Sequence, residues 1–153
     1  SKNTKTILIG YGGAAKAILY YLTLMGYWNY KNIVVLNRTK RKICIPKCPQ
    51  IKTLPLEKVL DHIGGARLVI NTIPGNVFKD LKIKKIEKKI TVCDIVYKPK
   101  ETKFLRHFVS PKAKVYGIDM LINQAKPCFY KWFGFLPSTD KDLNKKILKK
   151  ISQ

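Results

Sequence analysis

A glycine-rich stretch near the start of the chain has the residue types and spacing of a phosphate-binding turn. The apolar segment Ile7–Ile9 runs into Gly10–Ala15 (GYGGAA), and a helix-like segment, Lys16–Leu22, follows. In such a strand-turn-helix unit the first glycine permits the sharp turn, the second lets the backbone approach a pyrophosphate, and a small third residue lets helix and strand pack closely. The helix N-terminus also offers free N–H groups and a positive dipole end to phosphates. The pattern predicts a Rossmann-type dinucleotide site whose turn consists of Gly10, Tyr11, Gly12, Gly13 and Ala14.

The residues after the next predicted strand, Asn32–Leu36, are placed to read the adenosine ribose of such a nucleotide. NAD-selective sites have Asp or Glu here, which accepts a hydrogen bond from the ribose 2′-OH, whereas this chain has Asn37, Arg38 and Thr39. Arg38 can make a bidentate contact with a 2′-phosphate, Thr39 can donate its hydroxyl, and Lys42, one helical turn after Arg38, can add a positive charge. We predict NADP rather than NAD. The alternative is a solvated basic turn in a lysine-rich chain.

Composition limits the other functions that the chain could have. With 153 residues and 46% hydrophobic residues it can form one domain with a core, and no apolar run reaches the roughly 18 residues of a membrane span. A net charge of +22 would attract polyanions, but the lysines are spread from Lys2 to Lys150 and no aromatic and basic stripe accompanies them. We expect a soluble, cytoplasmic domain with no membrane partner and no specific nucleic-acid partner. A basic polyanion-binding protein is the alternative, with an affinity that falls steeply with salt and does not depend on Arg38.

The four cysteines and two histidines predict no metal site, because they form no CxxC pair and have no metal-ligand spacing: Cys44, Cys48, Cys93, Cys128, His62 and His107. We expect free thiols. The apolar surroundings of Cys93 and Cys128 predict core positions, and Cys44 with Cys48 is the only candidate pair for redox chemistry.

The rest of the chain alternates predicted strands and helices. A helix is expected over Pro55–Ile63, and strands over Leu68–Asn71, Ile90–Ile95 and Val115–Tyr116. This order indicates an α/β fold with a doubly wound parallel sheet, whose functional residues lie in the loops after the strands. Three of these loops, 71–74, 94–99 and 117–125, carry distinctive polar and aromatic residues.

Taken together, the motifs resemble the C-terminal, NADP-binding half of the shikimate dehydrogenases. The resemblance runs from Ile7 to about Pro137, and it rests on four motifs in the family's order: Gly10–Ala14, Asn37–Thr39, Asp94–Thr102 (DIVYKPKET) and Met120–Ala125 (MLINQA). It implies the reversible, NADP-linked reduction of 3-dehydroshikimate to shikimate in aromatic amino-acid biosynthesis. Shikimate and quinate are both left open as the natural substrate.

The resemblance also implies a role for each matching residue. Gly10–Ala14 match the pyrophosphate turn, and Asn37, Arg38, Thr39 and Lys42 match the 2′-phosphate reader. The positions that line the nicotinamide side are Thr72, Ile73, Ile95, Gly117 and Met120, and those that reach the substrate are Tyr97 and Gln124. Ile73 stands where the family has a hydroxyl residue, and Asp119 where it has glycine. Tyr97 as a loop aromatic that caps the core and Gln124 as a solvated helix residue are the alternatives.

In that family, an N-terminal substrate domain supplies the lysine and aspartate that handle the proton, so the resemblance implies no catalytic residue in this chain. We therefore expect a half-enzyme that is inactive alone, with a stand-alone NADP-binding or sensing module as the alternative. Residues 1–137 are predicted to form the NADP-binding domain and residues 138–153 a terminal helix capped by Ser138 or Thr139. Its apolar stripe, which includes Leu143 and Ile147, is expected to pack toward the substrate domain or to mediate self-association.

Overall fold

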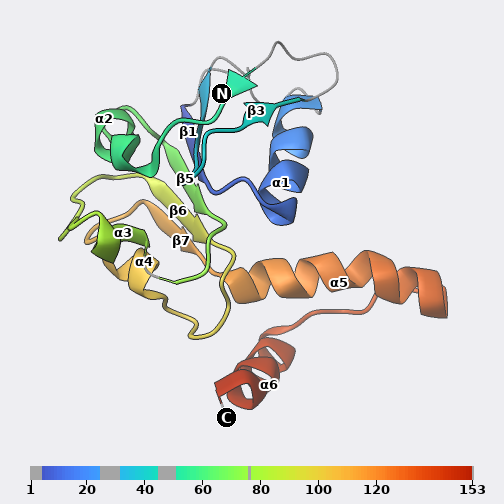
Figure 1. The fold of residues 1–153 in the computed structure, drawn as a ribbon. Coiled ribbons are helices and arrows are strands. Elements are labelled where there is room, and N and C mark those ends of the chain that lie inside the picture. Colours follow the sequence, from blue (N-terminus) through green and yellow to red (C-terminus); the bar gives the residue numbers. More distant parts are fainter. Residues whose placement is uncertain (1–4, 25–31, 45–50, 76, 153) are drawn as a thin grey trace.

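The computed structural model describes residues 5–24, 32–44, 51–75 and 77–152, which fold around a parallel sheet with strand order β2-β1-β5-β6-β7 (Figure 1). The strands are β1 (Thr6–Ile9), β2 (Ile33–Leu36), β5 (Leu68–Asn71), β6 (Thr91–Asp94) and β7 (Ala113–Val115). All four pairings are parallel, and Ile7 of β1 lies in register with Val34 of β2 and Val69 of β5. The predicted α/β class, with a parallel Rossmann-like sheet, is confirmed.

The strand order reverses between β1 and β5. From β1 the chain crosses to β2 on one side, and it then returns to β5 on the other side of β1. In open α/β sheets ligands bind outside the carboxyl ends of the strands, at the point where the order reverses. The glycine turn after β1 and the loop after β5 therefore flank the position where this fold class places its ligands.

Helices cover both faces of the sheet (Figure 1). One face carries α1 (Gly13–Leu24), and the other carries α2 (Val59–Ile63), α3 (Val77–Asp80) and α4 (Lys103–Arg106). Strand β1 contributes side chains to both faces of the sheet, because successive side chains of a strand point to opposite faces. Leu8 packs in the cluster of α1, whereas Ile7 and Ile9 pack in the cluster that holds Phe78 and Phe104. Four consecutive buried residues in β1 thus mark a central strand.

Residues after β2 form a hairpin instead of the helix that the predicted spacing of Lys42 required. Strand β3 (Lys42–Ile43) pairs antiparallel with β4 (Ile51–Lys52). The expectation that Lys42 lies one helical turn beyond Arg38 is therefore wrong. The physical reason is a period of two: Ile43 is buried while its neighbours Lys42 and Cys44 are exposed, and β-branched isoleucine favours the extended backbone.

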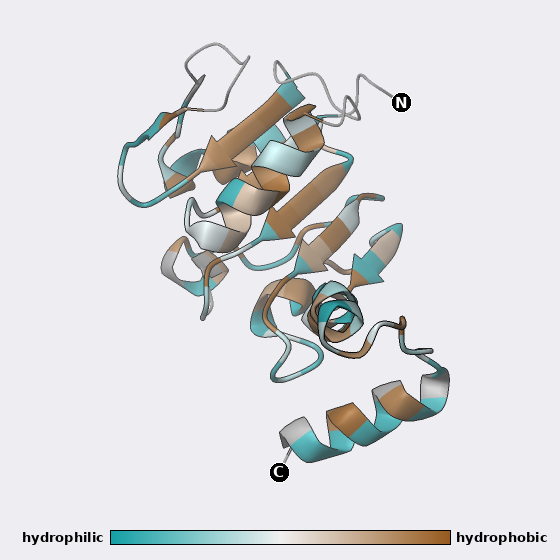
Figure 2. Ribbon diagram, turned by 90° about the vertical axis from the view of Figure 1, so that its right-hand side faces the viewer, coloured by the Kyte–Doolittle hydropathy of each residue, from teal (hydrophilic) through white to brown (hydrophobic). Residues whose placement is uncertain are grey.

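Two helices complete the chain. Helix α5 (Gly117–Phe133) passes through Pro127 as one continuous helix, extends away from the sheet, and ends at Gly134, which has a φ of 75°. Helix α6 (Lys141–Ser152) lies beyond it, with hydrophobic residues on one side and lysines on the other (Figure 2). The N–H of Leu143 donates to Asp140 Oδ1 at 2.7 Å, so Asp140 caps α6 rather than the predicted Ser138 or Thr139. Within the described ranges, no helix has the length and apolar character needed to cross a membrane.

Candidate functional site

The glycine turn and the loop after β5 meet at Gly10. Its φ of 101° lies in the region that favours glycine, and a Cβ at this position would collide with Thr72 Oγ1 and with Ile73 Cγ1. Thr72 is fixed there because its N–H and its hydroxyl both donate to Ile9 O, at 2.8 and 2.7 Å. Only glycine therefore allows the two loops to pack this closely, and its positive φ also permits the sharp turn expected of the first glycine in a nucleotide-binding turn.

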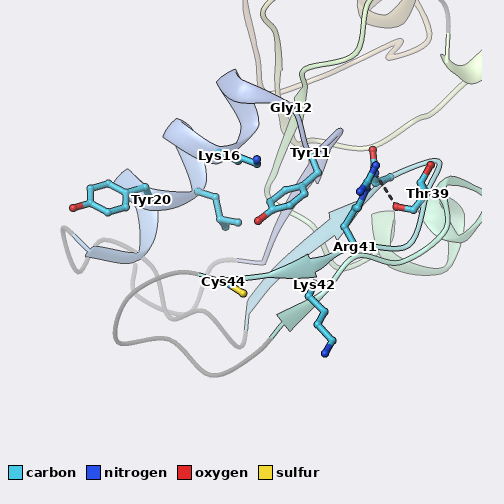
Figure 3. Close-up of a pocket in the computed structure, with 10 residues that line it drawn as sticks. Tyr11, Gly12, Lys16, Tyr20, Thr39, Arg41, Lys42 and Cys44 are labelled. Carbon is cyan, nitrogen blue, oxygen red and sulfur yellow. Dashed lines mark hydrogen bonds between the residues drawn. The ribbon is translucent and has the colours of Figure 1, made fainter.

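A cavity of about 760 Å³, here called the loop cavity, opens beside this turn (Figure 3). It lies between α1, the turn after β2 and the hairpin, and its lining consists of Tyr11, Gly12, Lys16, Leu19, Tyr20, Asn37, Thr39, Arg41, Lys42 and Cys44. Five of the predicted cofactor residues are thus brought together: Tyr11, Gly12, Asn37, Thr39 and Lys42. Gly13 and Ala14 are exposed at the start of α1, next to this lining.

The loop cavity is positively charged. Lys16, Arg41 and Lys42 line it, and no acidic residue is part of the lining. The ion pairs found among the described residues lie elsewhere, at Lys58–Asp61, Lys114–Glu101 and Lys146–Asp142. Lys16 Nζ lies 5.5 Å from the centre of the Tyr11 ring, which is a cation–π distance. A recess with three cations, next to the N-terminus of the twelve-residue helix α1, favours an anionic group.

The cations of the loop cavity are only partly those that the sequence predicts. Arg38 is exposed and does not belong to the lining, whereas Arg41 and Lys16 do. Asn37 Nδ2 donates to Thr39 O at 2.8 Å and so closes the turn that carries the exposed Arg38. Two sequence signals could have identified the missed residues. Lys16 lies in the first turn of the helix that follows the glycines, and Arg41 lies two residues before the buried Ile43.

A second cavity of about 410 Å³, the strand-end cavity, lies outside the carboxyl ends of β5 and β6. It is lined by Thr72, Pro74, Ile95, Val96, Tyr97 and Lys98. Thr72, Ile95 and Tyr97, which come from two separate predicted motifs, are therefore neighbours. The lining is mostly apolar, in contrast to the loop cavity, so it suits a flat aromatic group better than a phosphate.

The start of α5 packs directly on the loop after β6. Gly117 is buried, and a Cβ at this position would collide with the backbone oxygens of Ile95 and Val96. Met120 is half-buried in the first turn of α5, and Gln124 is exposed one turn further along. These two predicted residues lie outside the linings of the loop cavity and the strand-end cavity.

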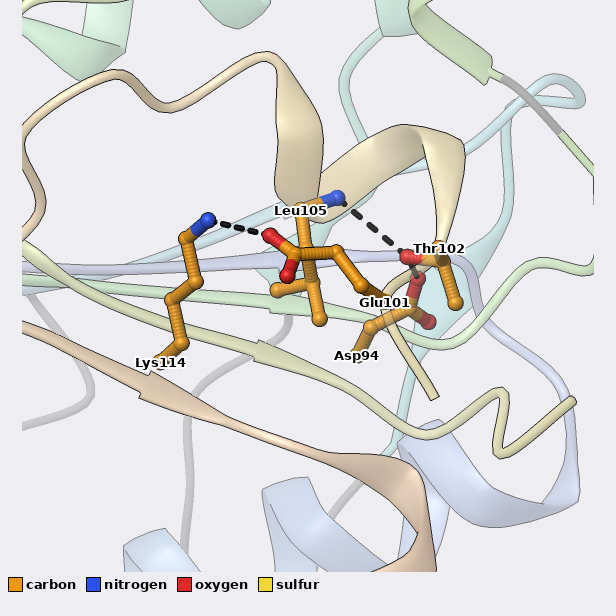
Figure 4. Close-up of polar contacts among 5 residues, drawn as sticks. All are labelled: Asp94, Glu101, Thr102, Leu105 and Lys114. Carbon is orange, nitrogen blue, oxygen red and sulfur yellow. Dashed lines mark hydrogen bonds and ion pairs between the residues drawn. The ribbon is translucent and has the colours of Figure 1, made fainter. Parts of the chain in front are cut away.

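A buried polar network supports the strand-end cavity (Figure 4). The carboxylate of Asp94, which is fully buried at the end of β6, accepts hydrogen bonds from Asn71 Nδ2 at 3.0 Å, from the N–H of Val96 at 3.1 Å and from Thr102 Oγ1 at 2.6 Å. Asn71 also holds both backbone groups of Ile73, and Thr102 caps α4 through the N–H of Leu105.

Burial raises the pKa of Asp94 above its usual value, although the hydrogen bonds from Thr102, Val96 and Asn71 oppose this. The network therefore connects the loops after β5 and β6 with the start of α4. The sequence motif contained Asp94 and Thr102, but nothing in the sequence indicated that Asn71 would join them.

The cysteines differ in their exposure. Burial, reinforced by the charges of Asp94 and Asp119, raises the pKa of the Cys93 thiol to about 11, which leaves it an unreactive thiol at neutral pH. Cys93 is half-buried, but the prediction that Cys128 is a core residue is wrong, because it is exposed on α5. Cys44 is exposed and lines the loop cavity, while Cys48 lies outside the described residues. Within the part of the chain that the structure describes, no group of His, Cys, Asp and Glu could hold a metal ion.

The strand order and the glycine turn define a Rossmann-like α/β domain, and comparisons with known proteins specify its relatives. No family model matches the chain. Over 162 residues it is 32% identical to the shikimate dehydrogenase (NADP(+)) of Bartonella quintana, and over 138 residues it is 33% identical to that of Pyrococcus abyssi. These alignments cover 96% and 88% of the chain but only 54% and 50% of the relatives. The chain therefore spans about half the length of the curated relatives that it matches.

Solved structures agree on the fold. The shikimate 5-dehydrogenase from Thermus thermophilus, in complex with NADP(H) and shikimate, matches 99% of the chain and 56% of its own length, with a TM-score of 0.63 at 21% identity. The quinate dehydrogenase from Corynebacterium glutamicum, in complex with NAD, matches 97% of the chain and 56% of its own length, with a TM-score of 0.66 at 19% identity. By sequence the chain is similar to about half of each of these shikimate dehydrogenases, and the solved structures share its fold.

Proposed function

We propose that the chain binds NADP(H) as the nucleotide-binding half of a shikimate dehydrogenase. The observation that carries this proposal is the loop cavity, which is lined by Gly12 and by three cations with no acid, and which lies beside the N-terminus of α1 and the turn that begins at the obligatory Gly10. The missing acid matters because NAD-selective sites use one to bind the ribose 2′-OH. Named relatives that are NADP-dependent enzymes support the same assignment and do not favour a stand-alone sensing module.

The residues present fit the cofactor in two separate parts. Gly10 and Gly12, followed by Gly13 and Ala14 at the start of α1, provide the close backbone approach that a pyrophosphate requires. The cations of the loop cavity, together with Thr39, would hold the 2′-phosphate. Thr72 and Ile95, which line the strand-end cavity, would hold the nicotinamide half, and Gly117 and Met120 at the start of α5 would lie on the same side.

When bound, NADPH supplies a hydride for the reduction of a ketone, which for this family is 3-dehydroshikimate. Tyr97, which is 42% exposed at the strand-end cavity, and Gln124, exposed on α5, are placed to contact the substrate from this half. The lysine and aspartate that the family uses for proton transfer belong to its other domain. We therefore expect the chain alone to show no shikimate oxidation, because a hydride acceptor without a proton acceptor does not complete the reaction. We place this chemistry in the cytoplasm, because the free thiols Cys44, Cys93 and Cys128 suit a reducing compartment.

Calorimetric titration of the chain with NADP and with NAD at physiological salt tests the cofactor assignment. Charge-assisted hydrogen bonds to the 2′-phosphate should make NADP bind more tightly than NAD by about 2–4 kcal/mol, a value that allows for the weakening of exposed contacts by solvent. Equal affinities would contradict the proposal. An affinity for NADP that falls steeply with salt, and that any other polyanion matches, would instead indicate a non-specific basic surface.

We further propose that residues 138–153 pack toward the substrate domain. In α6, Leu143, Ile147 and Leu148 are half-buried on one side, and exposed aromatic residues also lie at the end of α5. Phe129 contacts both Phe133 and Phe135, with ring centres 4.5 and 5.3 Å apart. Light scattering of the chain and of a version truncated after Pro137 tests this surface, since a chain without its partner domain is expected to self-associate through it. Monomers of unchanged stability in both cases would leave α6 without an interaction role.

A further inference from the structure

A third cavity, here called the α4 cavity, lies beside the loop after β6 and has no role in the proposed function. Its volume is about 240 Å³. Gly75 lines it from the loop after β5, Val96 and Pro99 line it from the loop after β6, and Thr102 lines it at the N-cap of α4. The strand-end cavity is its neighbour, because Val96 and Lys98 line both cavities. None of the predicted cofactor and substrate residues lines the α4 cavity.

Three cations converge on the α4 cavity. Lys98 comes from the loop after β6, and Lys103 and Arg106, which are three residues apart on α4, lie on the same side of that helix. Among the described residues no acid lines this cavity, and none of the three cations takes part in an ion pair. Like charges at this helical spacing repel one another, so a bound anion would relieve a repulsion that the folded chain otherwise retains.

The acids of the same segment are engaged by other groups (Figure 4). Glu101, which directly precedes Thr102, forms an ion pair with Lys114 of β7. The buried carboxylate of Asp94 accepts hydrogen bonds from the N–H of Val96 and from the hydroxyl of Thr102, both of which line the α4 cavity. Neither acid is therefore free to pair with the three cations, and Asp94 instead holds two residues of the lining in place.

The remaining lining of the α4 cavity and its size define the class of ligand. Val96 and Pro99 are apolar, and Gly75 contributes backbone alone. Lysine side chains add aliphatic stems that carry the charge at their ends. Ligand pockets usually have volumes of about 300–1,000 Å³, so a smaller cavity takes only a compact molecule. An inorganic anion would leave the apolar lining without a contact, and a neutral ring would leave the cations unpaired.

We propose that the α4 cavity binds a small organic carboxylate that carries a ring, at a site separate from the nucleotide. The guanidinium of Arg106 donates two parallel hydrogen bonds to the carboxylate, a geometry that arginine provides and lysine does not. Lys98 and Lys103 add positive charge, and Val96 and Pro99 contact the ring. This site does not depend on the proposed function, because no residue assigned to the cofactor belongs to it.

Titration of the isotopically labelled full chain with benzoate, followed by NMR of the backbone amides, tests the site. Benzoate should shift the amides of Lys103 and Arg106 until they saturate. Acetate, which has the charge without the ring, and benzyl alcohol, which has the ring without the charge, should each bind at least about fivefold more weakly. Equal binding of either analogue would overturn the class of ligand. Shifts centred on Thr72 or on Gly12 would place benzoate in another cavity and overturn the site.

A charge variant and its matched control assign the contact to α4. Arg106→Gln keeps a polar side chain at an exposed position but removes the charge, and it should weaken benzoate binding by about fivefold or more. Arg67→Gln makes the same change at an exposed arginine outside the lining and should alter that affinity by about twofold or less. Equal benzoate affinities in both variants and in the wild type would overturn the inference. A wild-type chain without a preference for NADP would overturn the proposed function alone.

Discussion

The loop cavity and the strand-end cavity lie at the same edge of the sheet but are lined by different kinds of residue. The loop cavity has a basic lining supplied by a glycine turn, a helix start and a short hairpin, and its cations have no acidic partners there. The strand-end cavity has a mostly apolar lining on loops that the buried Asp94 ties together. The first suits charged phosphates in solvent, and the second suits a flat ring that must be positioned accurately.

This difference implies that substitutions in the two regions should affect different properties of the protein. Changes under the strand-end cavity should cost folding stability, because backbone and buried polar groups are packed there. Changes to the exposed side chains of the loop cavity should cost nucleotide affinity with little effect on folding, because these side chains are not part of the core. The expected effects below run from the largest to the smallest.

The largest loss of stability is expected for Gly117→Ala. The added methyl group would collide with the backbone oxygens of Ile95 and Val96, which cannot move without displacing the loop after β6. Overpacking against backbone predicts a loss of about 3 kcal/mol in the free energy of unfolding. Urea denaturation measures it, with Gly65→Ala as the control because only the flexible Lys5 side chain lies near its Cβ. Equal stability of the two variants would show that α5 does not rest on this loop.

A smaller loss is expected for Thr102→Val. The substitution removes the hydroxyl that donates to buried Asp94 and caps α4, at a cost of about 2 kcal/mol at neutral pH. Thr91→Val, at the start of β6, is the control, because the structure shows no side-chain hydrogen bond for Thr91.

The pH dependence of this loss gives a second readout. Burial already raises the folded-state pKa of Asp94, and losing the Thr102 hydrogen bond should raise it further. The penalty for ionised Asp94 is absent below its unfolded-state pKa and complete above its folded-state pKa, so the loss should grow from acidic to neutral pH. A loss independent of pH would contradict the role of Asp94 in the network.

Thiol labelling provides a smaller effect that compares the two regions within one chain. At pH 8, Cys44 should react with iodoacetamide and Cys93 should remain almost unmodified, because its pKa of about 11 leaves little thiolate. Bound NADP should slow the labelling of Cys44 severalfold, since this residue lines the loop cavity. The exposed Cys128 is the internal control, and mass spectrometry of peptides reports each site. Equal protection of Cys44 and Cys128 would place the nucleotide elsewhere.

The sequence predicted those features that depend on local patterns. The buried strands, the glycine turn and the loops that carry Thr72 and Tyr97 could be identified because strand ends in a parallel sheet meet at one edge. The segment after β2 was wrongly predicted to be helical, because Lys40–Lys42 is charged and shows little hydrophobic periodicity. It forms a strand instead, and the pairing of β3 with β4 depends on contacts between separate segments of the chain.

The same limit explains which site residues the sequence missed. Arg41 lines the loop cavity from a backbone that is hydrogen-bonded to Thr53, twelve residues further along. Asn71 joins Asp94 across 23 residues for the same reason, namely that β5 and β6 are neighbours in the sheet. Cys128 looked like a core residue in an apolar segment, but α5 extends beyond the sheet and leaves it exposed.

The most direct test of the account follows the backbone amides of the isotopically labelled chain by NMR during two titrations. Adenosine 2′,5′-bisphosphate carries the 2′-phosphate and the adenosine-side 5′-phosphate but no nicotinamide. It should shift the amides of Gly12, Asn37 and Arg41 and leave that of Tyr97 in place. Full-length NADP should shift both groups. The account would be contradicted if the bisphosphate shifted the amide of Tyr97 as strongly as that of Gly12. It would also be contradicted if saturating NADP left the amides of the loop cavity unshifted.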